Sequence, residues 1–553
     1  MKELKMFIDG RFIEHESGKW IKVLNPSTEE VISLMPDGTV EDAERAIDAA
    51  EKAQGQWERT PSIERAAYLT KIAAGIRKRE KELTDIIVRE GGKTQGLANV
   101  EVLFTADYID YMAGWARRYE GEIIPSDRPR ESIFLFKKAI GVTTGILPWN
   151  FPFFLVARKA APALITGNTI VVKPSQLTPE NAYVFAQIVE EVGLPAGVFN
   201  LVNGRGSVIG HELAANPKVG MVSLTGSVSA GQQTMAAAAP NITKVSLELG
   251  GKAPAIVMED ADIDLAVKSI IASRVINTGQ VCNCAERVYV DKKVKDIFME
   301  KLVAGMKQVK VGNPNEIADL DMGPLIEANA LAAMEQKVEK AVRQGAKLLC
   351  GGHRIGTKGY FFEPTVLDCA TQEMDIIREE TFGPILPIVE YTDIDDAIAW
   401  ANDCEYGLTS SVYTQNLDYA FKIMRSLKFG ETYINRENFE AMQGFHAGWR
   451  KSGIGGADGK HGLEEYLQTH VVYIENKKKK IALIIWPCHR YDTIVPMRWH
   501  CCVTALAQQT SRLYLLQQVV FGKDIPHFLW CQTSINFSGN RDDRSQSASP
   551  HTT

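Results

Sequence analysis

Residues 140–176 read IGVTTGILPWNFPFFLVARKAAPALITGNTIVVKPSQ, and this stretch decides the fold. Two short apolar runs within it, residues 141–147 and 169–173, are typical of buried strands, and segments with helical period lie between most such runs. The same rhythm predicts three further strands: residues 198–202, 221–225 and 244–249. Strands that alternate with helices predict βαβ units and a parallel sheet, in which ligands bind at the carboxyl ends of the strands.

The segment before this sheet is predicted to begin as a β-hairpin and to continue as helices. Residues 7–8 and 12–13 flank Asp9-Gly10, a dipeptide that tolerates the positive φ of a tight turn. Thr39 and Asp42 then form a capping pair before an apolar helix face. Further helices are predicted over residues 63–90 and 98–118.

Two regions follow the first sheet. Residues 251–429 are predicted to form a second α/β region, with strands at 255–257, 287–290 and 411–413. Residues 476–553 differ in kind, because they contain no Glu, hold four of the nine Cys and follow no helical or strand period. We interpret them as an appended segment that is non-functional or poorly ordered. The alternative, a Cys/His metal module, lacks paired C-x-x-C spacing, so no metal site is predicted.

Composition and charge exclude several classes of protein. Residues 1–475 carry 52 Lys and Arg against 64 Asp and Glu, so nucleic acid is not an expected partner. No apolar run approaches the roughly 18 residues of a membrane-spanning helix, and no signal peptide precedes the first hairpin. The nine cysteines have no framework spacing, so disulfides are not expected. These features predict a cytoplasmic protein that acts on small molecules.

Cys282 is the candidate nucleophile. It lies in the stretch NTGQVCNCAER at residues 277–287, where Gly279 and Gln280 let the chain turn and aim the thiol into a cleft. A cysteine reacts as the thiolate, which nearby N–H groups or positive charge stabilise. The alternative is a buried structural cysteine, and it loses weight only when the other motifs are added.

Glu248 and Asn150 are the candidate partners of Cys282. Glu248 ends a predicted strand and is followed by Gly250 and Gly251, so its carboxylate could move and serve as a general base. Asn150 lies in a loop fixed by two prolines and offers an uncharged amide donor, which suits an oxyanion site. A solvated strand end and a structural turn remain the alternatives for these two residues.

Other strand ends suggest a dinucleotide site. Lys173-Pro-Ser-Gln176 follows one strand, and Thr225-Gly-Ser227 ends another and opens a helix whose amino terminus could hold pyrophosphate. The spacing of Gly204, Gly206 and Gly210 only approximates the usual glycine fingerprint and is weak evidence alone.

Together these motifs make residues 6–475 resemble the aldehyde dehydrogenase superfamily. The matching motifs, in order, are Pro148-Trp-Asn-Phe-Pro152, Lys173-Pro-Ser175, Thr225-Gly-Ser227, Glu248-Leu-Gly-Gly251, Gly279-Gln-Val-Cys282 and Glu379-Glu-Thr-Phe-Gly-Pro384. Within the superfamily, residues 139–155 and 433–462 are most similar to the bacterial lactaldehyde and glycolaldehyde dehydrogenases.

The resemblance implies an α/β fold with a Rossmann-type cofactor domain, an α/β catalytic domain and a small oligomerisation β-element. The NAD-binding domain would span residues 1–120 and 140–250. The oligomerisation element would span 121–139 and 463–475, and the catalytic domain 251–462. Residues 476–553 are left as the atypical tail. The assembly implied is a homo-oligomer, specifically a tetramer.

The resemblance also implies a reaction. Cys282 would attack the aldehyde to give a thiohemiacetal, and Asn150 and the Cys282 backbone N–H would hold the oxyanion. Hydride transfer to a nicotinamide would leave a thioester, and Glu248 would activate the water that hydrolyses it. Family members that transfer the acyl group to coenzyme A lack this glutamate, so Glu248 argues for release of a carboxylic acid.

Cofactor contacts carry over to twelve residues: Leu147, Trp149, Lys173, Ser175, Gln176, Gly206, Ser207, Gly226, Ser227, Leu249, Glu380 and Phe382. One of them departs from the family, because NAD-preferring members commonly have Glu where this chain has Gln176. An amide can hydrogen-bond the adenosine ribose but does not repel the 2′-phosphate of NADP. We therefore expect NAD as the cofactor, with NADP tolerated.

For the substrate, the resemblance indicates Arg158, Asn283, Glu440 and His446, polar groups suited to the α-hydroxyl of lactaldehyde or glycolaldehyde. An ordinary loop pair is the alternative for His446 and Glu440. Other functions remain open: oxidation of another small aldehyde or semialdehyde, a non-catalytic structural relative, or a thiol-dependent esterase. The cofactor motifs at Lys173 and Gly226-Ser227 argue against the esterase, because an esterase does not need them.

Overall fold

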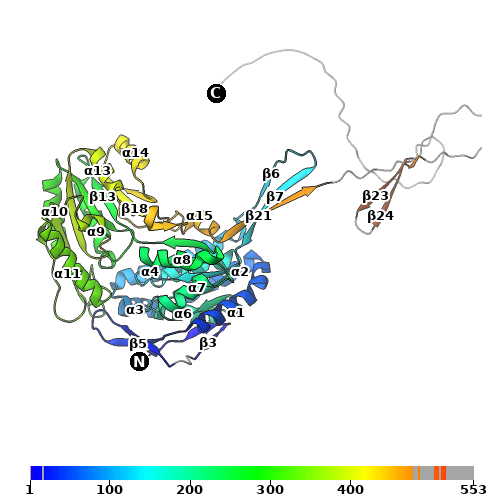
Figure 1. The fold of residues 1–553 in the computed structure, drawn as a ribbon, viewed down its shortest axis with the longest axis horizontal. Coiled ribbons are helices and arrows are strands. Elements are labelled where there is room, and N and C mark those ends of the chain that lie inside the picture. Colours follow the sequence, from blue (N-terminus) through cyan, green and yellow to red (C-terminus); the bar gives the residue numbers. More distant parts are fainter. Residues whose placement is uncertain (1, 15–17, 477–483, 486–502, 510–511, 519–553) are drawn as a thin grey trace, which may run out of the picture. The chain divides into compact units, whose positions relative to one another are not determined.

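The computed structural model describes residues 2–14, 18–476, 484–485, 503–509 and 512–518 (Figure 1). The chain forms two compact units. One comprises residues 1–126 and 132–473, and the other comprises residues 127–131 and 474–553. The first unit contains both large sheets and every residue discussed as a candidate site.

The larger sheet has eight strands in the order β20-β12-β11-β8-β9-β10-β2-β3. Its five central strands run parallel: β12 (Lys244–Glu248), β11 (Val219–Thr225), β8 (Val142–Ile146), β9 (Thr169–Lys173) and β10 (Phe199–Leu201). The first hairpin adds β2 (Met6–Ile8) and β3 (Arg11–Ile13) antiparallel to one another, with Asp9 and Gly10 at φ 52° and 76°. The predicted parallel sheet and hairpin are confirmed.

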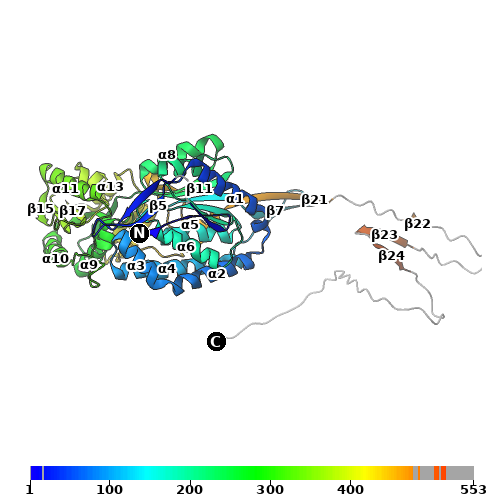
Figure 2. The ribbon, with the colours of Figure 1, turned by 90° about the horizontal axis from the view of Figure 1, so that it is seen from below.

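Helices cover both faces of this sheet. One buried cluster holds α1 (Val40–Arg59), α7 (His211–Ala215) and α8 (Val228–Ala238). The other holds α2 (Ser62–Lys78), α3 (Glu80–Gly91), α4 (Gln95–Ala113), α5 (Phe154–Ile165) and α6 (Glu180–Glu191). Figure 2 shows α8 on the opposite side of the sheet from α2, α3 and α4. The Thr39–Asp42 capping box is confirmed at α1, whereas the stretch predicted over 63–90 is two helices that meet at Arg79.

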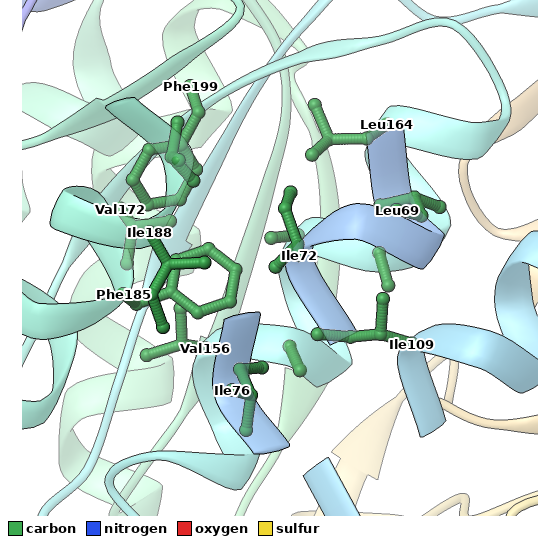
Figure 3. Close-up of a cluster of buried hydrophobic side chains, with 14 of the residues drawn as sticks. Leu69, Ile72, Ile76, Ile109, Val156, Leu164, Val172, Phe185, Ile188 and Phe199 are labelled. Carbon is green, nitrogen blue, oxygen red and sulfur yellow. The ribbon is translucent and has the colours of Figure 1, made fainter. Parts of the chain in front are cut away.

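The packing of the second cluster fixes the position of β9 and β10 along the direction of the strands. Val172 of β9 and Phe199 of β10 face Ile72 and Ile76 of α2, with Phe185 of α6 beside them (Figure 3). The Phe185 and Phe199 rings lie 5.2 Å apart. Because all five residues of β9 are buried, a shift of this strand along the sheet would expose apolar side chains.

The second sheet has seven strands in the order β15-β16-β17-β14-β13-β18-β19. Their bounds are Lys347–Cys350, Thr365–Asp368, Ile385–Tyr391, Ala285–Asp291, Ala253–Val257, Thr409–Tyr413 and Glu431–Ile434. All pairs are parallel except β15 with β16. The flanking helices are α9 (Ile263–Val275), α10 (Lys295–Gln308), α11 (Ala328–Arg343), α12 (Asp375–Arg378), α13 (Ile394–Asn402) and α14 (Leu417–Ser426). This second α/β region is confirmed.

Smaller elements join these layers. The strand β20 (Gly453–Ile454) pairs antiparallel with β12, although it lies within the range predicted for the catalytic domain. β6 (Glu122–Ile124), β7 (Glu131–Ala139) and β21 (Leu467–Glu475) form a three-stranded sheet, and β1 (Lys2–Glu3), β5 (Val31–Pro36) and β4 (Trp20–Leu24) form another. The remaining short helices are η1 (Gly114–Arg117), η2 (Gly206–Gly210), η3 (Ala239–Asn241), η4 (Ile276–Gly279), η5 (Arg450–Ser452) and α15 (Gly459–Glu464).

The second unit contains a three-stranded antiparallel sheet of β22 (Ile484–Ile485), β23 (Val503–Gln509) and β24 (Arg512–Gln518). The sequence pattern predicts no strand there. The rest of the predicted tail lies outside the described residues. Among the helices that the structure describes, none is long and apolar enough to cross a membrane. In the same ranges no three His, Cys, Asp or Glu side chains are grouped to hold a metal ion.

Candidate active site

Two pockets meet around Cys282. One is lined by side chains of α4 and α5 and of the segment after β19, and the other by the ends of β11 and β12 and the loop after α12. Four residues line both pockets: Asn150, Thr225, Glu248 and Cys282. The three predicted catalytic residues, which lie far apart in the sequence, therefore lie at one junction. A reactant entering through either pocket would meet the same thiol.

The loop before Cys282 is conformationally strained. Asn277, Thr278 and Gly279 have φ values of 46°, 60° and 73°, although a β-branched residue such as Thr278 rarely adopts a positive φ. Tertiary contacts hold this conformation, because the Thr278 hydroxyl donates to the carbonyl of Gly323 at 3.0 Å. The buried Gln280 adds a second tie, since its Oε1 accepts the Ile326 N–H at 2.9 Å. The strained turn directs Cys282 into the pocket junction.

Glu248 is the last residue of β12, and its carboxylate is buried. Neither oxygen has a hydrogen-bond partner within the described part of the chain. Burial raises the pKa of Glu248 to about 7, with His446 and Arg158 acting in the opposite direction. A carboxylate with unpaired oxygens and a pKa near neutrality can accept a proton from a water molecule in the pocket.

The glycines after Glu248 have a packing role that the sequence does not reveal. A Cβ atom at Gly250 would lie 2.5 Å from the Glu380 Oε2, and one at Gly251 would lie 2.4 Å from the Cys282 carbonyl oxygen. The two residues without side chains let the end of β12 approach both the Cys282 loop and Glu380. A side chain at Gly251 would push β12 away from the Cys282 backbone, whereas one at Gly250 would displace the Glu380 carboxylate.

Asn150 links the two loops that carry the reacting groups. Its Nδ2 donates to the Gln280 carbonyl at 3.2 Å, and the Asn277 Nδ2 donates to the Asn150 carbonyl at 3.2 Å. Its Oδ1 accepts the N–H of Phe151. An amide nitrogen has two N–H donors, so one remains after the bond to Gln280. Asn150 is therefore held beside Cys282 with a donor available for an oxyanion.

The pocket beyond β11 and β12 collects half of the predicted cofactor residues. Its lining includes Trp149, Gly226, Ser227, Leu249, Glu380 and Phe382. Trp149 and Phe382 meet edge to face with ring centroids 5.6 Å apart. The other six lie outside this lining, near the carboxyl ends of β8, β9 and β10: Leu147, Lys173, Ser175, Gln176, Gly206 and Ser207.

The residues present fit a nicotinamide dinucleotide. Lys173 is buried, and its Nζ donates only to the neighbouring Pro174 carbonyl at 3.0 Å, with no acidic partner among the described residues. Burial lowers its pKa to about 8, so the ammonium lacks a counter-charge or acceptor that a bound ribose or phosphate would supply. Ser227 caps α8 by accepting the Ala230 N–H, which leaves that helix amino terminus facing the same pocket.

The four predicted substrate residues all line the pocket next to α4 and α5. Arg158 Nη2 lies 3.5 Å from Glu440 Oε1, and the Asn283 Nδ2 donates to Glu440 Oε2 at 2.5 Å. His446 Nδ1 lies 2.7 Å from a carboxylate oxygen of Glu431. The structure therefore brings all four into one pocket, where Glu440 joins Arg158 and Asn283, and His446 pairs separately with Glu431.

Several residues of the site have no local signal in the sequence. Asp458 pairs with Arg158 through two contacts, one of them Nε to Oδ1 at 2.9 Å, and Glu431 anchors His446. The aromatic side chains that line this pocket come from three different segments: Phe104, Phe151, Phe154 and Phe439. Only the tertiary packing of α4, α5 and the segment after β19 assembles them, so sequence spacing could not have found them.

Comparison with known proteins identifies the family of this chain. The model of the aldehyde dehydrogenase family matches residues 12–472. The chain belongs to the aldehyde dehydrogenase family. It is 67% identical over 471 residues to the lactaldehyde dehydrogenase of Escherichia coli, covering 85% of this chain and 98% of that one. It is 38% identical over 485 residues to a D-glyceraldehyde dehydrogenase (NADP(+)) of Picrophilus torridus, covering 87% of this chain and 98% of the other.

Solved structures of known proteins have the same fold as this chain. A crystal structure of lactaldehyde dehydrogenase from Escherichia coli superimposes with a TM-score of 0.85 at 66% identity, covering 86% of this chain and 99% of that chain. These similarities confirm the predicted family, the aldehyde-dehydrogenase-like α/β fold and the prediction that this chain is an aldehyde dehydrogenase enzyme. Since aldehyde dehydrogenases use NAD or NADP, a nicotinamide cofactor is confirmed as well. The roles of individual residues and the domain boundaries stay predictions.

Proposed function

We propose that this aldehyde dehydrogenase oxidises a short 2-hydroxyaldehyde, lactaldehyde or glycolaldehyde, to the carboxylate. The observation that carries the proposal is the set of polar side chains in the pocket that contains Cys282. Arg158, Asn283, Glu440 and His446 line it next to Cys282, so an α-hydroxyl would meet hydrogen-bonding groups once the carbonyl reaches the thiol. The similarity to lactaldehyde dehydrogenase supports the same substrate class.

Each catalytic residue has a proposed step. The Cys282 sulfur attacks the aldehyde carbon, and the free amide N–H of Asn150 together with the Cys282 backbone N–H stabilises the oxyanion. A nicotinamide held beside Glu380 and Phe382 would supply the hydride acceptor, and Cys282 would then carry the acyl group as a thioester. Glu248 then takes a proton from water as the water attacks the thioester. The carbon–sulfur bond breaks, which regenerates the Cys282 thiolate and releases the carboxylic acid.

The cofactor would lie along the strand ends of the first sheet. Lys173 is suited to hold a ribose hydroxyl or phosphate, and Glu380 is suited to bond the ribose nearest Cys282. Glu380 is itself positioned, because its Oε1 accepts the Gly251 N–H at 2.7 Å. Trp149 and Phe382 would border the ring and keep it next to the thiol.

Glycolaldehyde and propanal test the substrate proposal. Propanal cannot bond the polar side chains and would leave buried partners unsatisfied, which costs about 1–3 kcal/mol. We expect kcat/KM for glycolaldehyde or lactaldehyde to exceed that for propanal by about 10- to 100-fold, measured as NADH absorbance. An equal or greater value for propanal would contradict the assignment and favour another small aldehyde. Ester cleavage without NADH formation would indicate a thiol-dependent esterase instead. Absence of both reactions would indicate a non-catalytic structural relative.

The second prediction concerns Gln176 and the preference for NAD over NADP. We propose NAD as the main cofactor with NADP tolerated, because the exposed Gln176 amide after β9 lacks the charge that would repel a 2′-phosphate. Gln176→Glu is expected to lower kcat/KM for NADP by about tenfold or more, because like charges then meet, and to leave the value for NAD within about twofold. Steady-state rates with each cofactor measure this ratio. An unchanged ratio, or wild-type protein with no NADP activity, would contradict it.

We also propose a cytoplasmic homotetramer. The sheet of β6, β7 and β21 supports an assembly role, because large apolar side chains lie exposed on it, among them Ile123, Phe136 and Tyr473. The domain division into residues 1–120 with 140–250, 121–139 with 463–475, and 251–462 belongs to the same proposal. Residues 476–553 have no proposed role in the reaction.

A further inference from the structure

A buried carboxylate stands behind the pocket and holds His446. Glu431 of β19 accepts a hydrogen bond from His446 Nδ1 at 2.7 Å, and the two side chains are 13% and 2% exposed. The Tyr433 hydroxyl donates to the other oxygen of the same carboxylate. With both oxygens engaged, Glu431 cannot rotate freely, so the imidazole ring is fixed in one orientation.

That orientation turns the other ring nitrogen toward the reacting groups. His446 Nε2 lies 3.5 Å from Glu248 Oε2, and His446 lines the same pocket as Cys282. His446 therefore shares one pocket with the nucleophile and the base, and an N–H on Nε2 would face Glu248.

The charged groups around His446 come from several elements. Glu431 and Tyr433 lie on β19, Glu248 ends β12, Arg158 lies on α5, and Glu440 and Asp458 flank the pocket. Arg158 would repel a protonated ring, but its guanidinium is paired with Asp458 through two contacts. The surroundings therefore contain more acid than base, which favours a positively charged imidazole.

The protonation behaviour agrees with this geometry. Burial acts to lower the pKa of His446, and Arg158 acts in the same direction, but Glu431 and Cys282 raise it well above its usual range. Burial acts to raise the pKa of Glu431, yet the partnership with His446 holds it below its usual value. Burial raises the pKa of Cys282, and His446 opposes that rise.

We propose that Glu431 and His446 form a buried ion pair whose imidazolium stabilises the thiolate of Cys282. This inference rests on the proposed role of Cys282 as nucleophile. When the thiol ionises, its proton passes to water in the pocket, and the sulfur keeps the electron pair of the S–H bond. His446 keeps both of its protons. Glu431 is then a positioning residue that keeps the imidazole charged, and His446 acts on the reacting sulfur through its positive charge in the same pocket.

Alkylation of the full-length protein tests the ion pair without cofactor or aldehyde. Iodoacetamide reacts with the thiolate, and mass spectrometry of the peptide that contains Cys282 gives its rate constant as a function of pH. In Glu431→Gln the imidazole loses its counter-charge, so we expect the pH of half-maximal rate to rise by at least one unit. At pH 7 this corresponds to about a tenfold slower reaction. His446→Gln is expected to shift the profile in the same direction.

Two control variants make the result specific. Glu437→Gln removes an exposed carboxylate from the same segment and should leave the profile unchanged. Glu440→Gln removes a negative charge that disfavours the thiolate, so it should shift the profile to lower pH. Circular dichroism reports the fold of each variant, and if Glu431→Gln does not fold, His446→Gln decides.

The inference is overturned if Glu431→Gln and His446→Gln are folded and their alkylation profiles coincide with that of the original chain. It is also overturned if Glu431→Asp, which keeps the charge, shifts the profile as far as the glutamine variant. Failure of the ion pair differs from failure of the proposed function. NADH formation from glycolaldehyde with an unshifted alkylation profile would remove only the ion pair. If Cys282 is not labelled at any pH, that result counts against its role as the nucleophile.

Discussion

Cys282→Ser is expected to abolish aldehyde oxidation, with a loss of at least about 10⁴-fold in kcat. The hydroxyl occupies nearly the same volume as the thiol, but it does not ionise near neutral pH, and no thioester can form. The strained loop at Asn277 and Thr278 and the hydrogen bonds of Asn150 do not involve the sulfur, so the pocket should persist. NADH absorbance with glycolaldehyde measures the loss, and NADH fluorescence shows whether the cofactor still binds.

Cys284→Ser is the matched control, since it lies two residues away and its thiol points into the protein. Cys284 Sγ lies 3.0 Å from the Val281 carbonyl, and burial raises its pKa to about 12. A thiol so resistant to ionisation is a poor nucleophile. We expect Cys284→Ser to keep its turnover within a few-fold. Loss of activity in Cys284→Ser together with an active Cys282→Ser would show that the nucleophile is wrongly assigned.

Glu248→Gln is expected to separate the two halves of the reaction. The first turnover, which needs Cys282 and Asn150, should still give a burst of NADH about equal to the concentration of active sites. Steady-state turnover should then fall by about 10²- to 10⁴-fold, because the amide cannot take a proton from water. Stopped-flow absorbance resolves the burst from the slow phase. Unchanged steady-state turnover would remove Glu248 from the role of base.

The pH dependence of the original enzyme gives an independent check on the same residue. Burial raises the pKa of Glu248 to about 7, so below that pH the carboxyl carries a proton and cannot act as a base. Steady-state kcat should therefore increase with pH through about 7 wherever thioester hydrolysis limits turnover. The slow phase of Glu248→Gln should lack this rise. A variant with the same rise would show that another group titrates.

Much of the fold follows from local patterns. The alternation of apolar runs and helices from residue 140 onward predicts the parallel sheet, and β9 has the predicted bounds of 169–173. The Asp9-Gly10 turn and the Thr39 cap are short-range features whose conformations depend on neighbouring residues, so they could be predicted as well. The break at Arg79 was missed because the apolar pattern continues across it.

The active site divides in the same way. Cys282, Glu248 and Asn150 stand in motifs with distinct local composition, so the sequence alone identifies them as candidates and orders them along the chain. Their meeting at one junction depends on β12 and the Cys282 loop approaching each other across the space left by Gly250 and Gly251. Contacts between distant segments have no signature in either segment taken alone.

By itself the sequence determined the family, the parallel sheet, and the nucleophile, base and amide donor as candidates, because each rests on residues close together in the chain. Only the tertiary structure decided which charges surround them. It pairs Arg158 with Asp458 and His446 with Glu431, and it buries Glu248 without a hydrogen-bond partner among the described residues. Burial and the distance between charges set the protonation of each group, and both arise only when separate strands and helices pack together.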